Sequence, residues 1–124
     1  MAQVQIKFQD TKAGGKPAKV VAFSGQLDET NVDEEAKKIY AVIDKMAEPN
    51  LILDFSGLDY MNSKSIGYLT DWYSRIMAKN GKLVIASPKP NILDILKVVG
   101  ITQIISVHSS LEEAQGAFGK SAVK

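Results

Sequence analysis

The sequence has no cysteine, a single histidine, few aromatic residues and almost no excess of charge of either sign. Without cysteine, the 124-residue chain can form neither a disulfide framework nor a cysteine–zinc site, and it has no thiol nucleophile. Its 15 lysine and arginine residues against 14 acidic residues leave a net charge of +1, so we expect no nucleic-acid partner. A chain free of cysteine also suits a reducing compartment, which favours a cytoplasmic location.

Long apolar runs are missing as well. A signal peptide needs about 7–15 consecutive apolar residues and a membrane span about 20, whereas the apolar runs here are short, such as Leu51-Ile52-Leu53. The N-terminal segment alternates instead, with Val4, Ile6 and Phe8 on one side. We therefore expect no targeting segment and no direct insertion into a membrane.

Residues that could carry catalysis are few and scattered. His108 is the only histidine, and nothing in the sequence supplies it with a nucleophile and an orienting group. Gly14-Gly15 lies in a predicted hairpin loop and lacks the strand-to-helix setting of a phosphate-binding loop. Asp54 ends a predicted strand, as the phosphate-accepting aspartate of a receiver domain does, but only Asp10 stands where that chemistry needs acidic metal ligands. We predict that the protein is not an enzyme and needs no cofactor or metal ion.

Strand and helix patterns alternate along the chain, with no linker that would divide it. Residues 3–8 and 19–23 predict two antiparallel strands joined by a glycine-containing loop at 10–17. Apolar residues then recur at helical spacing from Val32 to Met46, with Thr30 or Asn31 as the cap. Further strands are expected at 51–55, 82–86 and 103–107, and further helices at 63–79, 91–99 and 111–118. The inner face of the helix at 63–79 is expected to consist of Ile66, Leu69, Tyr73, Ile76 and Met77.

These elements predict an α/β fold. The sheet is expected to be small and mostly parallel, with an antiparallel edge strand and about four helices. We expect a single domain over residues 1–124, with its core at about 3–118.

The most informative stretch runs from a buried strand through a short polar turn into the helix predicted at 63–79. Asn62 or Ser63 can cap this helix, since either side chain can accept a hydrogen bond from a free backbone N–H. The same hydroxyls would also stand at the positive end of the helix dipole, where an added phosphate is electrostatically favoured. The residues alone leave capping and regulation both open.

Six stretches of the chain carry a family resemblance. They are Gly25 to Asp28, Leu53 to Leu58, Asn62 to Gly67, Gly81 to Ile85, Ile95 to Ile101 and Leu111 to Ala114. In this order, and over nearly the whole chain, they resemble the STAS domain, the family of anti-sigma factor antagonists and related bacterial regulators. Residues 62–67, called the signature segment below, fall where that family has Asp/Asn-Ser-Ser/Thr-Gly-Leu/Ile-Gly.

The resemblance implies a STAS fold and a regulator that binds a protein partner. Antagonists of this family bind an anti-sigma factor that is a serine kinase of the GHKL ATPase type. The kinase phosphorylates the second hydroxyl residue of the signature, the added charge breaks the complex, and a metal-dependent serine phosphatase restores it. On this sequence the resemblance places partner binding at Asp28 and at the signature segment, which consists of Asn62, Ser63, Lys64, Ser65, Ile66 and Gly67.

The sequence departs from the family pattern at the phosphorylated position. That position is Lys64, which cannot form a phosphate ester, and the glycine that follows it in the family is Ser65. Either Ser63 or Ser65 has taken over phosphorylation, with Lys64 beside it to pair the phosphate, or the switch is lost, which is the reading we favour. Lys64 also puts a cation at the positive end of a helix, where it is unfavourable.

Two further alternatives follow from the sequence. A STAS module could instead bind a small ligand, such as a nucleotide or a lipid, or serve as a subunit of a transport complex, because fold and function are separable. Tyr68 and Trp72 are four residues apart and share a helix face. That face either packs under neighbouring helices or forms an exposed anchor for a partner.

Overall fold

The protein is built on a five-stranded sheet whose strands follow one another in chain order. A computed structural model describes residues 3–120, and the side chains up to residue 117. β1 pairs antiparallel with β2, and every later pair of neighbours is parallel. The elements are β1 (Val4–Ala13), β2 (Lys16–Leu27), α1 (Val32–Lys45), β3 (Asn50–Met61), α2 (Ser63–Ala78), β4 (Lys82–Ala86), α3 (Pro90–Val98), the 3₁₀ turn η1 (Ile101–Gln103), β5 (Ser106–His108) and α4 (Leu111–Lys120).

The first hairpin is longer and its turn is tighter than the sequence predicted. Gly14 and Gly15 have φ values of 60° and 80°, the left-handed conformations that a two-residue hairpin turn requires at both positions. Ala13 therefore already pairs with Lys16. The expected loop at 10–17 was wrong because the two glycines alone reverse the chain.

β3 also extends past its predicted end at Phe55. It continues to Met61 beside β2, and the pairing of β2 with β3 is irregular between Ala22 and Ser24. Gly57 lies in this stretch, where a Cβ would come within 2.9 Å of the Phe23 carbonyl oxygen. Its lack of a side chain lets the two strands stay close and run on to the edge of the sheet at which α1 and α2 begin.

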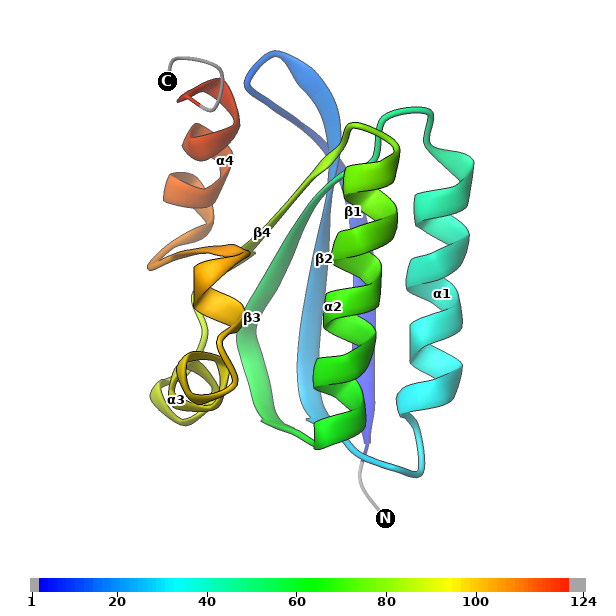
Figure 1. Cartoon of the computed structure of the whole chain (residues 1–124), viewed down its shortest axis with the longest axis vertical. Coiled ribbons are helices and arrows are strands. Elements are labelled where there is room, and N and C mark those ends of the chain that lie inside the picture. Colours follow the sequence, from blue (N-terminus) through cyan, green and yellow to red (C-terminus); the bar gives the residue numbers. More distant parts are fainter. Residues whose placement is uncertain (1–2, 121–124) are drawn as a thin grey trace.

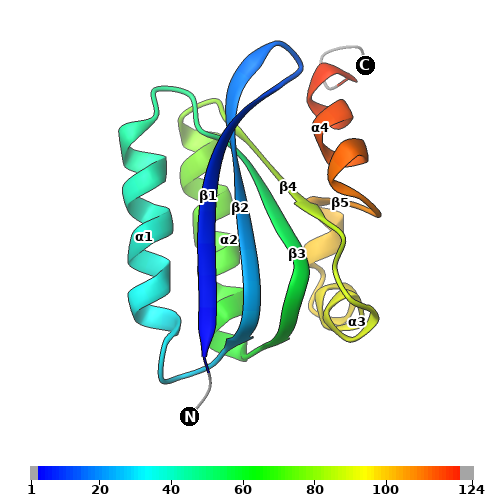
Figure 2. The ribbon, with the colours of Figure 1, turned by 180° about the vertical axis from the view of Figure 1, so that it is seen from behind.

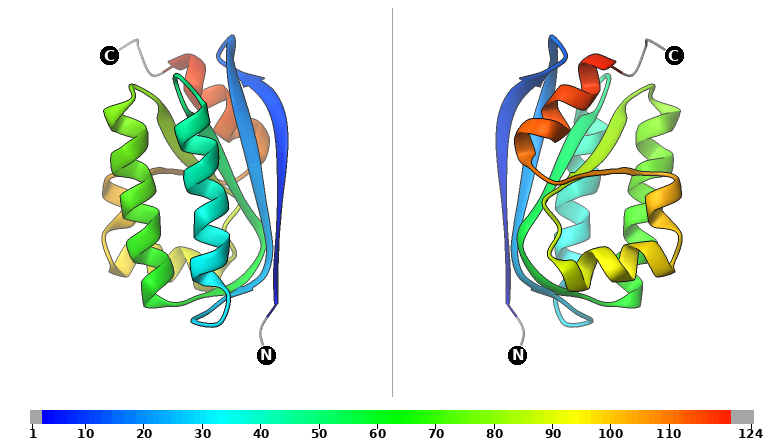
Figure 3. Two further views of the ribbon diagram at one scale, coloured as in Figure 1. Left: turned by 90° about the vertical axis from the view of Figure 1, so that its right-hand side faces the viewer. Right: turned by 90° about the vertical axis from the view of Figure 1, so that its left-hand side faces the viewer.

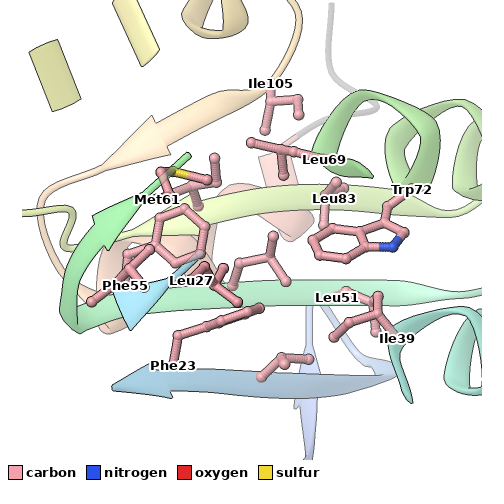
Figure 4. Close-up of a cluster of buried hydrophobic side chains, with 14 of the residues drawn as sticks. Phe23, Leu27, Ile39, Leu51, Phe55, Met61, Leu69, Trp72, Leu83 and Ile105 are labelled. Carbon is pink, nitrogen blue, oxygen red and sulfur yellow. The ribbon is translucent and has the colours of Figure 1, made fainter. Parts of the chain in front are cut away.

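Successive residues of β3 contribute to two different apolar clusters. Leu51 and Leu53 belong to the larger cluster, with α1 and α2, whereas Ile52 lies in a smaller cluster with Ala114 of α4. Figures 1 and 2 show α1 and α2 side by side along one face of the sheet. The centre of the larger cluster is drawn in Figure 4.

The α2 face that packs on the sheet differs from the prediction by about one residue. Leu69 and Ile76 are buried as expected, but Met77 is 48% exposed and Trp72 is 4% exposed. Trp72 points into the apolar cluster in Figure 4. Of the two alternatives for the aromatic face, the packed one is therefore correct for Trp72.

The last strand is shorter and later than predicted. Gly100 adopts a φ of 82° after α3, and the chain forms η1 before β5 begins at Ser106, so the strand expected at 103–107 was misplaced. With β5 in place, the α/β fold with its mostly parallel sheet, antiparallel edge strand and four helices is confirmed. No helix within residues 3–120 is long and apolar enough to cross a membrane.

Candidate functional site

Two turns meet at the edge of the sheet where β2 and β3 end. Leu27 and Met61 are the last paired residues of these parallel strands, and the Asn62 backbone N–H donates to the Leu27 carbonyl oxygen at 3.2 Å. The turn from β2 to α1 (residues 28–31) therefore lies next to the signature segment. Both helices begin at this edge, at the lower end of the view in Figure 1.

The β2–α1 turn is held by its own side chains. An Asp28 carboxylate oxygen accepts hydrogen bonds from the Thr30 N–H at 2.9 Å and the Thr30 hydroxyl at 2.6 Å, and these bonds lower the pKa of Asp28. The Asn31 amide oxygen accepts from the Asp28 N–H at 3.0 Å. Asn31 is the residue before α1 but makes no side-chain cap bond, so neither predicted cap forms. The turn is nevertheless fixed in shape.

Asn62 caps α2, as one of the sequence alternatives predicted. Its side-chain oxygen accepts a hydrogen bond from the Ser65 N–H at 2.9 Å and another from the Ser65 hydroxyl at 2.6 Å. Ser65 is 1% exposed. The Ser65 hydroxyl is therefore enclosed in the start of the helix, whereas Ser63 is exposed.

Lys64 reaches across to α1 and pairs with Asp33. Its ammonium nitrogen lies 2.9 Å from one Asp33 carboxylate oxygen and 3.1 Å from the other. The Tyr68 hydroxyl donates to the same carboxylate at 2.6 Å. These two partners, Tyr68 first, lower the pKa of Asp33, and the carboxylate in turn raises the pKa values of Lys64 and Tyr68. The carboxylate compensates the unfavourable placement of a cation at the start of α2.

Asp33 is a site residue that the sequence offered no reason to single out, and so are the groove residues Tyr60, Ile95 and Val99 described below. Asp33 stands in the first turn of α1, where an acid is common because the helix end is positive. The pairing with Lys64 comes from the parallel packing of α1 on α2, a contact between residues 31 positions apart. Periodicity within either helix carries no signal for it.

The other predicted partner-binding residues are brought together. Lys64 and Gly67 are exposed like Ser63, and Ile66 is partly buried. A Cβ placed on Gly67 would meet no atom within 4 Å, so open space surrounds this helix position. Asp28 lies in the adjoining turn. The signature segment thus offers a polar, accessible surface with one apolar side chain.

An apolar groove of about 430 Å³ lies between the signature segment and α3. Tyr60 and Val99, which line it, are 46% and 51% exposed. Ile66 closes the α2 side and Ile95 the α3 side. Figure 3 shows α3 at the end of the molecule where α1 and α2 begin. Half-exposed apolar side chains beside an accessible polar segment are typical of a surface that binds another protein.

Polar and aromatic side chains also connect α1 with α2, further along the two helices. The Tyr40 hydroxyl donates to the Asp71 carboxylate, and burial together with this bond raises the pKa of Tyr40 to about 12. The Arg75 guanidinium lies 4.6 Å from the centre of the Tyr40 ring. Tyr40 and Trp72 meet edge to face with ring centroids 6.5 Å apart. The two helices that carry Asp33 and Lys64 are therefore held in one fixed arrangement.

Little at this site favours catalysis. The single histidine belongs to β5 rather than to the signature segment. Among the described residues, no group of three or more histidine, aspartate or glutamate side chains is close enough to hold a metal ion. What the arrangement offers is recognition, through exposed hydroxyls, a paired cation and an apolar groove.

Known proteins resemble this chain in sequence. The family model of the STAS domain matches residues 9–114. BtrV of Bordetella bronchiseptica, assigned as an anti-sigma factor antagonist, is 25% identical over 99 residues, which cover 80% of this chain and 84% of BtrV.

Solved structures share the fold. An anti-sigma factor antagonist from Mycobacterium paratuberculosis superposes with a TM-score of 0.77 at 18% identity, covering 90% of this chain and 91% of that one. The unphosphorylated form of the anti-sigma factor antagonist SpoIIAA gives 0.70 at 23% identity, over 87% of this chain and 92% of that one. A phosphorylated form of SpoIIAA, from Bacillus, gives 0.68 at 21% identity, over 89% and 96%. The chain belongs to the STAS domain family, as an anti-sigma factor antagonist-like regulator rather than an enzyme.

Proposed function

We propose that this protein binds an anti-sigma factor of the serine-kinase, GHKL ATPase type, through the signature segment, the β2–α1 turn and the apolar groove. The observation that carries the proposal is the continuity of the groove with the signature segment, since Ser63 and Ile66 belong to both. The relatives named above are anti-sigma factor antagonists, so an anti-sigma factor is the partner class they suggest.

The surface has the composition of a protein interface. Tyr60, Ile95 and Val99 give it an apolar centre, and Ser63 and Lys64 add polar groups at its margin. A partner that covers the groove would remove apolar area from water, which stabilises a complex by roughly 25 cal/mol per Å² of apolar surface before the costs of association. The polar margin would then fix the orientation of the partner.

We further propose that conventional switching by phosphorylation is lost. Lys64 occupies the family's acceptor position and is paired with Asp33. Of the two remaining hydroxyls, Ser65 is buried and serves the Asn62 cap, so a kinase would have to open the helix end to reach it. Ser63 is the accessible alternative. A phosphate on Ser63 would also compete with Asp33 for the Lys64 ammonium.

The proposal places the protein in the cytoplasm, with a metal-dependent serine phosphatase as a further partner only if Ser63 or Ser65 is phosphorylated. Two alternative roles from the sequence are outcomes of the test below. They are binding of a small ligand and membership of a transport complex.

Affinity capture from host extract, with Mg-ADP or Mg-ATP, tests the proposal. Partners and bait are identified by mass spectrometry. A serine-kinase anti-sigma factor that stays bound in Mg-ATP to an unmodified bait is the expected result. Release in Mg-ATP with phosphate on Ser63 or Ser65 would overturn the loss of switching but keep the partner. If no such kinase is captured, the partner proposal fails and the alternatives take its place.

Matched variants locate the surface. Val99→Asp puts a charge into the groove, and Met77→Asp puts one on the far part of α2, at nearly equal exposures of 51% and 48%. The first should reduce kinase capture at least tenfold and the second should leave it unchanged, because an unpaired charge in a desolvated contact costs several kcal/mol. Equal capture by both variants would remove the groove from the interface.

A further inference from the structure

A second cavity, of about 570 Å³, opens at the carboxyl ends of β4 and β5, away from the signature segment. It is larger than the groove beside that segment. In open α/β sheets the carboxyl ends of parallel strands are the usual place for small ligands. Figure 3 shows α3, η1 and β5 grouped on one side of the molecule, and residues of all three line the cavity.

The lining combines apolar walls with convergent polar groups. Leu93 and Val107 provide apolar surface, while the hydroxyls of Ser87, Thr102 and Ser109 provide donors and acceptors. Small-molecule sites have this character and volumes of roughly 300–1,000 Å³. The proposed partner surface uses none of these residues.

The cavity has a cation in its lining, while at Ser109 the backbone N–H donates to the Glu113 carboxylate at 3.2 Å. Lys97, in the last turn of α3, lines the cavity, and no aspartate or glutamate does. Within the part of the chain that the structure describes, the Lys97 ammonium forms no ion pair. Lys97 therefore supplies one cation that can pair with an anionic group of a ligand.

The fold holds one wall of the cavity in a costly conformation. Ser87 is not glycine but has a φ of 57°, and such left-handed residues concentrate at ligand sites, where the surrounding structure enforces them. Its N–H donates to the His108 carbonyl oxygen at 2.8 Å, and its hydroxyl to the Ser109 carbonyl oxygen at 3.3 Å. These bonds tie the end of β4 to β5 and shape the cavity before any ligand arrives.

His108 adds a hydrogen-bonding group that the protein does not use. His108 lines the cavity, and its buried Nε2 has no partner among the described residues. Buried polar atoms are nearly always paired, so an orphan needs an explanation.

We propose that this cavity binds a small organic monocarboxylate, with its carboxylate at Lys97 and the neighbouring hydroxyls and its alkyl part against Leu93 and Val107. The proposal is independent of the partner surface, because the two sites share no lining residue.

Titration of the ¹⁵N-labelled protein with hexanoate, followed by NMR, tests this site without any protein partner. Hexanoate should shift the amide resonances of Thr102, Val107 and Ser109 in a saturable manner, and the neutral hexanamide should bind at least fivefold more weakly. Lys97→Gln should weaken hexanoate binding about tenfold, as loss of a charge-assisted hydrogen bond does. Lys45→Gln, at an exposed lysine in the last turn of α1, is the matched control and should change nothing.

Three results would overturn the proposal. One is the absence of saturable shifts up to about 20 mM hexanoate, a concentration that would detect even millimolar affinity. Another is equal affinity of the Lys97→Gln variant and the unmodified protein. The third is a set of shifts spread over exposed lysines, which would mean diffuse ion binding. None of them bears on kinase capture, so this site and the partner surface fail or stand separately.

Discussion

The ammonium of Lys64 at the start of α2 lies 2.9 Å from a carboxylate oxygen of Asp33 in the first turn of α1. This pair joins two helices at the position where the family resemblance leads us to expect a phosphorylated hydroxyl. The cation cannot accept phosphate, and its charge is compensated by the neighbouring helix. The site is therefore built around an ion pair that the two helices hold in place.

Replacing Lys64 with serine should restore modification by the cognate kinase. Lys64 is exposed, so a serine at this position would present an accessible hydroxyl at the usual acceptor position. Incubation with kinase and Mg-ATP should add one phosphate at residue 64, measured by intact mass and peptide mapping. The same change in a Ser63→Ala background controls for phosphorylation of the neighbouring Ser63. An unmodified Lys64→Ser protein, with an active kinase bound to it, would contradict the expectation.

Asn62→Ala should destabilise the protein by about 1–2 kcal/mol. The change removes a cap of typical value about 1 kcal/mol, and it also leaves the Ser65 hydroxyl without its acceptor. Urea unfolding followed by circular dichroism measures the loss. Asn62→Asp, which keeps an acceptor oxygen, should lose much less, and equal losses in the two variants would argue against the cap.

Asp33→Asn should lower stability at neutral pH but not in acid. The pKa of Asp33 is lowered in the folded protein, chiefly by the Tyr68 hydroxyl and then by Lys64. Because its pKa is lower in the folded protein, the ionised Asp33 carboxylate stabilises the fold above the unfolded-state pKa of about 3.9. This contribution is lost as the pH falls through the folded-state pKa. In urea unfolding, the difference between the midpoints of the unmodified protein and the Asp33→Asn variant should therefore be constant near pH 7 and shrink below about pH 4. A gap that is the same at pH 7 and pH 3 would show that the charge of Asp33 is not its cause.

Gly67→Ala should stabilise the isolated protein and weaken partner binding. Glycine inside a helix costs about 1 kcal/mol relative to alanine, and the added Cβ would meet open space. Thermal unfolding measures the gain, and kinase capture measures the binding.

Gly116→Ala in α4 is the control for this prediction, because Gly116 is also an exposed helical glycine with nothing within 4 Å of a Cβ. It should give a similar gain in stability with unchanged capture. Reduced capture by both variants, or by neither, would mean that Gly67 has no specific part in the contact.

The fold was predictable where periodicity decides it. Alternation and helical spacing located the edge strand and the four helices, because each places its apolar residues on one face. The inner face predicted for α2 was wrong at Met77, which fits the same helical spacing as the buried residues but is exposed. Packing of α1 against α2 buries Trp72 instead. The length of β3 was missed because Ser56-Gly57 has the composition of a turn, yet here it lets two strands approach.

Sequence motifs were enough to propose where the candidate site lies, but not to predict its bonds. The order of motifs located the signature segment, and local capping chemistry predicted that Asn62 could act as it does. The ion pair of Lys64 with Asp33 and the groove shared by Ile66 and Val99 arise between elements far apart in the chain. Such contacts depend on how helices and strands pack, which no local pattern reports.

The paired Lys64 also has a consequence for how a cell would set the response. A regulator that a kinase can mark is controlled by the ratio of kinase to phosphatase activity, and its total amount matters less. If the mark cannot be written, the same complex is governed by mass action alone, so the copy numbers of antagonist and anti-sigma factor decide how much of each is free. Control then moves from the ATP supply to gene expression and protein turnover. The output becomes a threshold set by stoichiometry.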